Sequence, residues 1–156
     1  MIIIFTINMQ YLEILIKLRK IIRSINLESK KIQKGFGISI PQLLVLKYLS
    51  EQEDYKASAK DIKGYINLNA STISGIIQRL EEKGLVARLP NSDDKRGRFV
   101  TLTAKGADLL KESPTTLEEK LSRRLKKLSA KQIEELYTSI EILTQLMEAD
   151  EIDAPL

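Results

Sequence analysis

The sequence contains no cysteine and no histidine, and each absence excludes a kind of chemistry. Without cysteine there are no disulfides, thiolate metal sites, iron–sulfur clusters or thiol redox switches. Without histidine there is no Ser-His or Cys-His catalysis, and the most common zinc ligand and the usual general base near neutral pH are missing. We therefore expect a protein that is not an enzyme and that carries no cofactor and no metal site.

Long hydrophobic runs are also missing. No apolar run reaches the roughly 18–20 residues of a membrane span, and no basic residues precede the apolar start from Met1 to Phe5, as they would in a signal peptide. Together with the lack of cysteine, this predicts a cytoplasmic protein with no membrane partner. Two interpretations of the start stay open. Either Met9 is the true start and residues 1–8 are a gene-calling artefact, or residues 1–8 form a strand-like extension.

The chain has 156 residues, 43% hydrophobic and 29% charged, which is ordinary composition for about one globular domain. Its 25 basic and 21 acidic residues give a net charge of +4, and this excess lies in one segment. Residues 57–105 hold nine basic and five acidic side chains, whereas the rest of the chain balances at sixteen of each. The distribution favours a central module that faces a polyanion, flanked by neutral scaffold segments.

The outer segments have the periodicity of amphipathic helices. Residues 10–34 repeat apolar side chains at helical spacing, and glycines directly after them end the helix. A second helical segment, 103–128, contains Pro114, which predicts a kink or a break. A third helix is predicted over 129–149, where apolar residues step by three and four along a seam that comprises Ile133, Leu136, Ile140, Leu143 and Met147.

The central segment predicts three short helices followed by a hairpin. Capping residues precede each helix and place the helices at 40–51, 59–66 and 70–83, behind Ser39, Ser58 and Asn69. Two short runs rich in β-branched and aromatic residues, 85–89 and 98–102, flank a polar loop. The fold class is therefore mainly α with a small β-hairpin wing, a winged helix-turn-helix over 39–102 with further helices at both ends.

The helix over 70–83 has an apolar face, on which Ile73, Ile76, Ile77 and Leu80 lie at spacings of three, one and three, and a polar face. Placing Ile73, Ile77 and Leu80 inward leaves hydroxyl, amide and guanidinium groups on the outer face and its flanks. Such groups suit base edges and phosphates in the major groove. In the hairpin loop, Lys95, Arg96 and Arg98 surround a glycine, and an arginine at such a tip can enter a narrow minor groove.

Three stretches of sequence resemble the MarR family of transcriptional regulators. These are Leu-Glu-Glu-Lys-Gly-Leu-Val at 80–86, Asp-Lys-Arg-Gly-Arg at 94–98 and Val-Thr-Leu-Thr-Ala-Lys-Gly at 100–106. In that family the recognition helix ends in L-E-x-x-G-L-V, the wing contains D-x-R, and the last strand runs into L-T-x-x-G. The order and spacing match, and the six predicted helices follow the family's order over nearly the whole chain.

The resemblance implies one domain over 1–156, a homodimeric regulator that binds double-stranded DNA at a palindromic operator. The helices at 10–34 and 103–149 would interlock with those of a second copy, and the region 39–102 would bind DNA. Repression of nearby genes is the simplest outcome, and activation stays open. Pro114 lies inside the family's usually continuous fifth helix, so either that helix is kinked or the dimer geometry differs.

The resemblance also assigns site residues. The expected DNA-binding residues are those of the recognition helix and the wing: Ser71, Thr72, Ser74, Gln78, Arg79, Asp94, Lys95, Arg96 and Arg98. Many members bind a small aromatic or acidic ligand between the dimerisation region and the DNA-binding head. Candidates to line such a pocket are Tyr11, Arg19, Phe36, Tyr48 and Leu109. The alternative is that these aromatic residues belong simply to the core or to an interface.

Three other functions are weighed against DNA-binding regulation. The first is a winged-helix module that binds a protein, but exposed wing arginines with few exposed aromatics fit phosphate contacts better. The second is an enzyme built from Asp, Glu, Lys, Tyr or Ser, for which no paired spacing is found. The third is a regulator that responds to hard cations through carboxylates, since transition-metal sensing through His or Cys is excluded.

Overall fold

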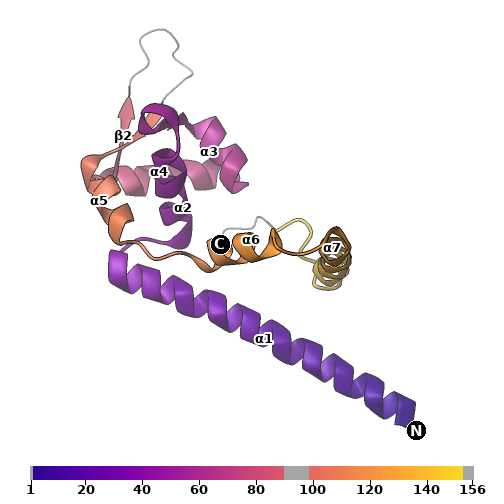
Figure 1. Cartoon of the computed structure of the whole chain (residues 1–156). Helices are drawn as coiled ribbons and strands as arrows, with labels where there is room; N and C mark the ends of the chain where they lie inside the picture. Colours follow the sequence, from indigo (N-terminus) through magenta and orange to yellow (C-terminus); the bar gives the residue numbers. More distant parts are fainter. Residues whose placement is uncertain (1, 90–98, 153–156) are drawn as a thin grey trace.

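The computed structural model describes residues 2–89 and 99–152, with the side chains of 9–89 and 99–152. The described part is mostly helical with one small sheet, as the sequence predicts (Figure 1). Its elements, in chain order, are α1 (Ile2–Phe36), α2 (Ile40–Ser50), η1 (Glu53–Tyr55), β1 (Lys56–Ser58), α3 (Ala59–Ile66), α4 (Ala70–Glu82), β2 (Val86–Leu89), β3 (Phe99–Leu102), α5 (Ala104–Glu112), α6 (Leu117–Leu125) and α7 (Ala130–Leu146).

The predicted capping residues start the helices. The Ser39 hydroxyl accepts a hydrogen bond from the backbone N–H of Gln42, and the Gln42 side chain accepts one from the backbone N–H of Ser39. The same reciprocal pair of bonds begins α3 at Ser58 and α7 at Ser129. These pairs satisfy backbone donors that have no partner inside a helix. A stretch of four or five residues is therefore enough to determine where each helix begins.

The sheet has three antiparallel strands in the order β1-β3-β2. The predicted hairpin is β2 and β3, in the register that pairs Val86 with Leu102 and Leu89 with Phe99. Strand β1, which pairs Ala57 with Val100 at the other edge of β3, is not among the predicted elements. A three-residue strand whose partner lies more than forty residues away has no local signal apart from one buried alanine.

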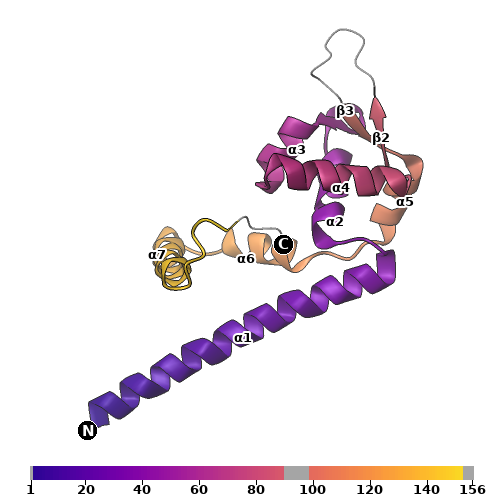
Figure 2. The same ribbon diagram turned by 180° about the vertical axis from the view of Figure 1, so that it is seen from behind.

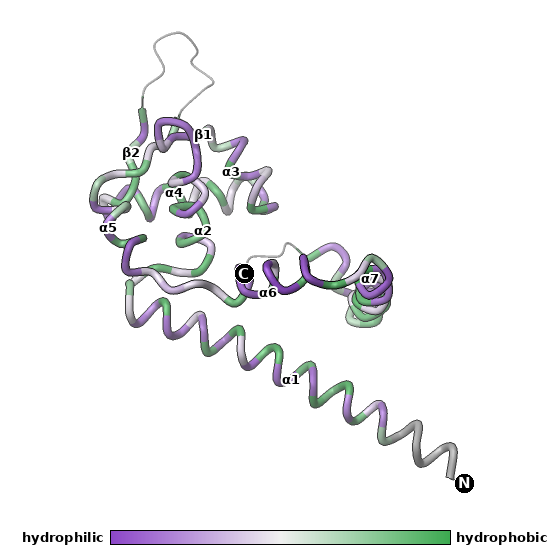
Figure 3. The backbone as a smooth tube through the Cα atoms, viewed as in Figure 1, coloured by the Kyte–Doolittle hydropathy of each residue, from purple (hydrophilic) through white to green (hydrophobic). Residues whose placement is uncertain are grey.

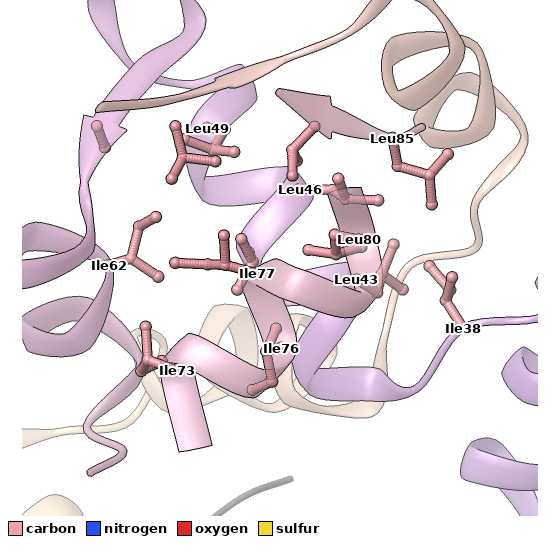
Figure 4. Packing of buried hydrophobic residues seen from close by; sticks show 14 of the residues in the cluster. Ile38, Leu43, Leu46, Leu49, Ile62, Ile73, Ile76, Ile77, Leu80 and Leu85 are labelled. Carbon is pink, nitrogen blue, oxygen red and sulfur yellow. The ribbon is translucent and has the colours of Figure 1, made fainter. Parts of the chain in front are cut away.

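The core lies inside the head, which is formed by α2, α3, α4 and the sheet. Figure 4 shows apolar side chains from α2, α3 and α4 meeting there, among them Leu46, Ile62 and Ile77. Each of these three is 2% exposed or less. Within α1, by contrast, Ile32 is the one described side chain that is buried, and no described side chain of α6 or α7 is buried. The head is thus packed within one chain, while the outer helices leave apolar side chains in water.

The outer helices lie apart from the head. Helix α1 runs beneath the head and extends well beyond it, on the side away from β2 and β3, and α6 connects the head to α7 (Figures 1 and 2). Figure 3 shows hydrophobic and hydrophilic residues alternating along α1, and residues of both kinds in α7. Within residues 2–89 and 99–152, none of the helices has the length and apolar character that a membrane span requires.

Of the predictions about the outer helices, the strand-like extension is wrong and the break at Pro114 is confirmed. Residues 2–8 continue α1 instead of forming a strand-like extension, because an amphipathic helix that is already nucleated adds a hydrogen bond with each further residue. The segment 103–128 is broken at Pro114 into α5 and α6, as the proline predicts, so the described residues contain seven α-helices. Ser113 has extended backbone angles, as expected for a residue before proline, and Pro114 has no N–H to continue the helix.

Candidate nucleic-acid interface

Helix α4 is held against the head by a short turn that follows α3. Asn67 ends α3 in the left-handed conformation, with a φ of 57°, and Leu68 is buried at 2% exposure, which fixes the path of the turn. The Asn69 side chain then accepts hydrogen bonds from the Thr72 backbone N–H at 2.8 Å and the Ser71 hydroxyl at 2.7 Å. The two helices and their tight turn form a helix-turn-helix with α4 in the recognition position.

The apolar face of α4 is buried as predicted, since Ile73, Ile76, Ile77 and Leu80 are each 5% exposed or less. The opposite face brings together the five predicted DNA-binding residues of this helix. Thr72 is half-buried and the other four are exposed: Ser71, Ser74, Gln78 and Arg79. Gly75 lies among them, and a Cβ added there would have no other atom within 4 Å, so this part of the face is open.

The polar residues of α4 differ in how they are held. The Gln78 amide donates a hydrogen bond to the Glu82 carboxylate at 3.0 Å, which orients the amide along the helix surface. Arg79 forms no ion pair within residues 9–89 and 99–152. It therefore adds an uncompensated positive charge at the edge of the outer face.

Other basic side chains near α4 serve to hold the head together. Lys83 donates to the Gly37 carbonyl at 2.9 Å, and Lys105 donates to the Lys83 carbonyl at 2.8 Å. Arg88 pairs with Glu81 at 3.0 Å. The positive charge of the central segment is therefore only partly available to a polyanion, a division that the charge count alone does not reveal.

The predicted wing residues Asp94, Lys95, Arg96 and Arg98 lie outside the described residues. The strands on either side are described, and the pairing of Leu89 with Phe99 sets where the loop leaves the sheet.

The L-T-x-x-G stretch and the glycine after α4 form one joint. Thr103 caps α5 by accepting from the Gly106 backbone N–H at 3.1 Å, and its hydroxyl donates to the Gly84 carbonyl at 2.7 Å. Gly84 has a φ of 70°, where a residue with a side chain would be strained. A Cβ on Gly106 would collide with the Leu85 carbonyl oxygen and would lie 2.8 Å from a methyl group of Leu102. The joint fixes α4 and the hairpin relative to α5.

The five predicted ligand-lining residues lie in separate places. Tyr11 and Arg19 are exposed on α1, and Phe36 and Leu109 pack at the edge of the core. Tyr48 stacks on Tyr65 with ring centroids 4.4 Å apart. In the single chain these residues do not form one lining.

A cavity of about 610 Å³ lies where α2 and α3 face the link between α5 and α6. Its lining includes Lys47, Tyr65, Pro114, Glu118 and Glu119. Of these, only Pro114 is marked by the sequence, as a helix breaker. Burial raises the pKa of the Tyr65 hydroxyl, and the nearby carboxylates of Glu51, Glu118 and Glu119 raise it further. The cavity therefore has an aromatic wall and an excess of negative charge.

The carboxyl groups at the start of α6 have opposite pKa shifts. Burial raises the pKa of Glu118, and repulsion from Glu119 and Glu28 adds to this. Burial also acts to raise the pKa of Glu119, but hydrogen bonds from Lys47 and Thr116 outweigh it, so that the pKa lies below its ordinary value. Glu119 is thus held ionised by its partners, whereas the ionised form of Glu118 is disfavoured.

The raised pKa of Glu118 makes a prediction about stability. Folding favours the protonated form of Glu118, so the native state loses stability as pH rises from the ordinary value of 4.5 through the raised one. Glu118→Gln should therefore raise the melting temperature near neutral pH, and this gain should disappear below pH 4.5. Thermal unfolding of both proteins across this range checks it, with Glu53→Gln as the exposed control. A gain that persisted in acid would contradict the assignment.

Among the side chains that the structure describes, no three carboxylates lie together in a group that could hold a metal ion.

The comparisons with known proteins agree with this geometry. A model of the MarR family matches residues 38–97, which begin just before α2 and include α3, α4 and β2. The organic hydroperoxide resistance transcriptional regulator of Bacillus subtilis is 31% identical over 130 residues, which cover 79% of this chain and 84% of that protein. An uncharacterised HTH-type transcriptional regulator of the same organism, YfiV, is 28% identical over 136 residues, covering 87% of this chain and 84% of YfiV.

Among solved structures, a MarR family transcriptional regulator from Streptomyces coelicolor, Sco3205, in complex with DNA, superposes with a TM-score of 0.61. It is 23% identical in sequence, and the match covers 90% of this chain and 92% of that one. At this identity the likeness supports the fold. The sequence relatives extend the match over most of the chain, including the outer helices.

Proposed function

Because the chain belongs to the MarR family of winged helix-turn-helix transcriptional regulators, we propose that it is a homodimer that binds a palindromic DNA operator and regulates nearby genes. The observation that carries the proposal is the outer face of α4. Hydroxyl, amide and guanidinium groups are exposed together on a helix held in the recognition position. The related protein from Streptomyces coelicolor is described in complex with DNA, which supports the same partner here.

Within α4 the proposed contacts divide into two kinds. Gln78 can pair with an adenine through both groups of its amide, which would replace its bond to Glu82. Ser71, Thr72 and Ser74 are near the helix start, where short hydroxyls reach base edges or phosphates. Arg79 is assigned to phosphate because it is an unpaired charge on the flank.

The wing is proposed as the second contact. Lys95, Arg96 and Arg98 would reach phosphates or the minor groove beside the half-site, and Asp94 would orient Arg96 by a charge-assisted hydrogen bond. This assignment rests on the sequence and on the family's D-x-R wing.

The outer helices are proposed to form the dimer, within the segments 10–34 and 103–149. Large apolar side chains are exposed along both α1 and α7, including Leu15 and Ile22 at about half exposure and Ile140 at 48%. Contiguous apolar surface of this kind marks an interface, and a two-fold dimer buries the same surface on both copies. The remaining region, 39–102, would then present two DNA-binding heads.

We assign repression as the mode of regulation, with relief by a small ligand. The cavity beside the α5–α6 link is a proposed ligand site, because it touches both the head and the outer helices. Its lining carries three carboxylates, Glu51, Glu118 and Glu119, against two cations, Lys47 and Arg123. This balance favours an aromatic ligand without negative charge over an acidic one.

No enzymatic activity is proposed, and the cytoplasm, which holds the chromosome, is the proposed site of action.

Two substitutions separate the proposed roles on DNA. Arg96→Ala should weaken binding to all sequences and reduce the slope of log affinity against log salt by about one, because one phosphate contact is lost. Gln78→Ala should instead change which half-site is preferred, at a cost of about 1–3 kcal/mol on the cognate base. Fluorescence anisotropy titrations on cognate and altered duplexes at several salt concentrations measure both effects. Unchanged affinity, salt slope and preference in both variants would refute the assignments.

A further inference from the structure

The link between α5 and α6 is tied to the head by one lysine. The Lys47 ammonium, on α2, donates to both carboxylate oxygens of Glu119 at 2.8 Å and to the Pro114 carbonyl at 3.2 Å. Its side chain is only 18% exposed, so these contacts are largely removed from water. Charge-assisted hydrogen bonds in such a setting are stronger than those at the surface.

The same link is tied to α1 on its other side. Thr116 is fully buried and caps α6, and the backbone N–H of Leu117 donates to the Glu28 carboxylate of α1 at 2.6 Å. Residues 114–119 therefore contact the head through Lys47 and the long N-terminal helix through Glu28. The head comprises residues 38–102, and the link and α6 comprise residues 113–125. Within the described residues, every hydrogen bond between these two parts is donated by Lys47.

This place in the chain is where the angle of the head is set. Residues 113–116 have no helical structure, so the chain can bend there at little cost, unlike a continuous helix. Figure 2 shows α4 in the head, on one side of the link, and α1, α6 and α7 on the other side. Large apolar side chains are exposed on α1, α6 and α7. In a dimer built on those faces, the angle at the link decides how far apart the two copies of α4 lie.

We propose that Lys47 is a positioning residue, whose bonds to Glu119 and Pro114 hold the head at one angle to the outer helices and so restrict operator binding to one half-site spacing. The inference rests on the proposed function, because half-site spacing has meaning only for a dimer on DNA. Lys47 itself lies on α2 and is assigned no contact with DNA.

The first arm of the test measures spacing preference. Operators carry the selected half-site with centre-to-centre spacing changed one base pair at a time around one helical turn, about 10 bp. The wild-type protein should bind one spacing more tightly than the others. In Lys47→Met, the ratio of affinity for the best spacing to affinity for the poor spacings should fall about tenfold, while affinity for the poor spacings stays unchanged. Lys47→Arg should retain the preference, because a guanidinium can bond the same oxygens. Lys111→Met, which removes an equal charge from an exposed pair with Asp108 on α5, is the matched control.

The second arm does not depend on DNA. Because the chain has no cysteine, spin labels attach only to the two cysteines introduced by Glu53→Cys in the head and Lys20→Cys on α1. Labelled chains are mixed with an excess of unlabelled ones, and pulsed electron paramagnetic resonance gives the distance distribution within one chain. We expect one narrow distribution in the wild-type background and in Lys111→Met, and a broadened or shifted one with Lys47→Met.

The outcomes separate the two proposals. If Lys47→Met folds and keeps both the spacing preference and the narrow distribution, the positioning role is overturned. If the wild-type protein selects no operator, the DNA-binding proposal fails, while the distance distributions still decide whether Lys47 holds the head. If Lys47→Met does not fold, Glu119→Gln takes its place, since it weakens the same bonds and keeps the size of the side chain. A narrow distribution in that variant likewise overturns the role.

Discussion

Replacing Gly106 by alanine is expected to lower the free energy of unfolding by about 3 kcal/mol. The added methyl group would collide with the Leu85 carbonyl oxygen, which is backbone and cannot move aside without shifting the joint between α4 and β2. That oxygen also accepts the Thr103 backbone N–H at 3.1 Å, so moving it loosens a hydrogen bond in the same joint. Urea unfolding followed by circular dichroism measures the loss.

Gly64→Ala is the matched control for this substitution. Gly64 lies within α3, and a Cβ there would meet no other atom within 4 Å. Alanine has the higher helix propensity, so this variant should gain up to about 1 kcal/mol. If Gly106→Ala were as stable as the wild-type protein, the close approach at Gly106 would be wrong, and the L-T-x-x-G glycine would need another explanation.

Ile140→Asp is expected to dissociate the dimer and, in consequence, to lower operator affinity at least about a hundredfold, because the second head then no longer binds within the same complex. Ile140 is 48% exposed in the single chain and lies on the predicted seam of α7, where a carboxylate would be left without water or a partner in the dimer. Sedimentation equilibrium measures the dissociation, and titration of the operator then measures the loss of affinity.

Thr138→Asp places the same charge on the opposite, polar face of α7, beside Glu134 and Glu141. It should leave the protein dimeric and the operator affinity nearly unchanged. An Ile140→Asp protein that remained dimeric at low micromolar concentration would remove this seam from the interface.

The parts of the structure that the sequence predicts well are those determined by neighbouring residues. Ser39, Ser58 and Ser129 cap helices as expected, because a cap is a bond between residues three apart. The outer face of α4 is likewise correct, because helical periodicity alone decides which residues share a face. The start of α6 after Pro114 also has a local signal, because Thr116 and Glu119 form a capping box, but this box is not among the predicted helix starts.

The parts that the sequence does not predict depend on residues far apart in the chain. Lys47 and Glu119 are 72 positions apart, and no local pattern marks either as a partner of the other. The same holds for β1, and for the cavity that Tyr65 and Pro114 line together. The candidate ligand residues were chosen by type, and Tyr11, Phe36 and Tyr48 lie in different surroundings because residue type does not determine position in space.

The most direct test of the central claim is selection of bound duplexes from a random DNA library by the purified protein, followed by titration of the best site at two salt concentrations. The account predicts an enriched palindrome whose half-sites lie about one helical turn apart, and affinity that falls steeply with salt. Binding without any enriched sequence would contradict a sequence-specific operator. No binding at any salt concentration would contradict DNA recognition itself and would favour a winged-helix module that binds a protein.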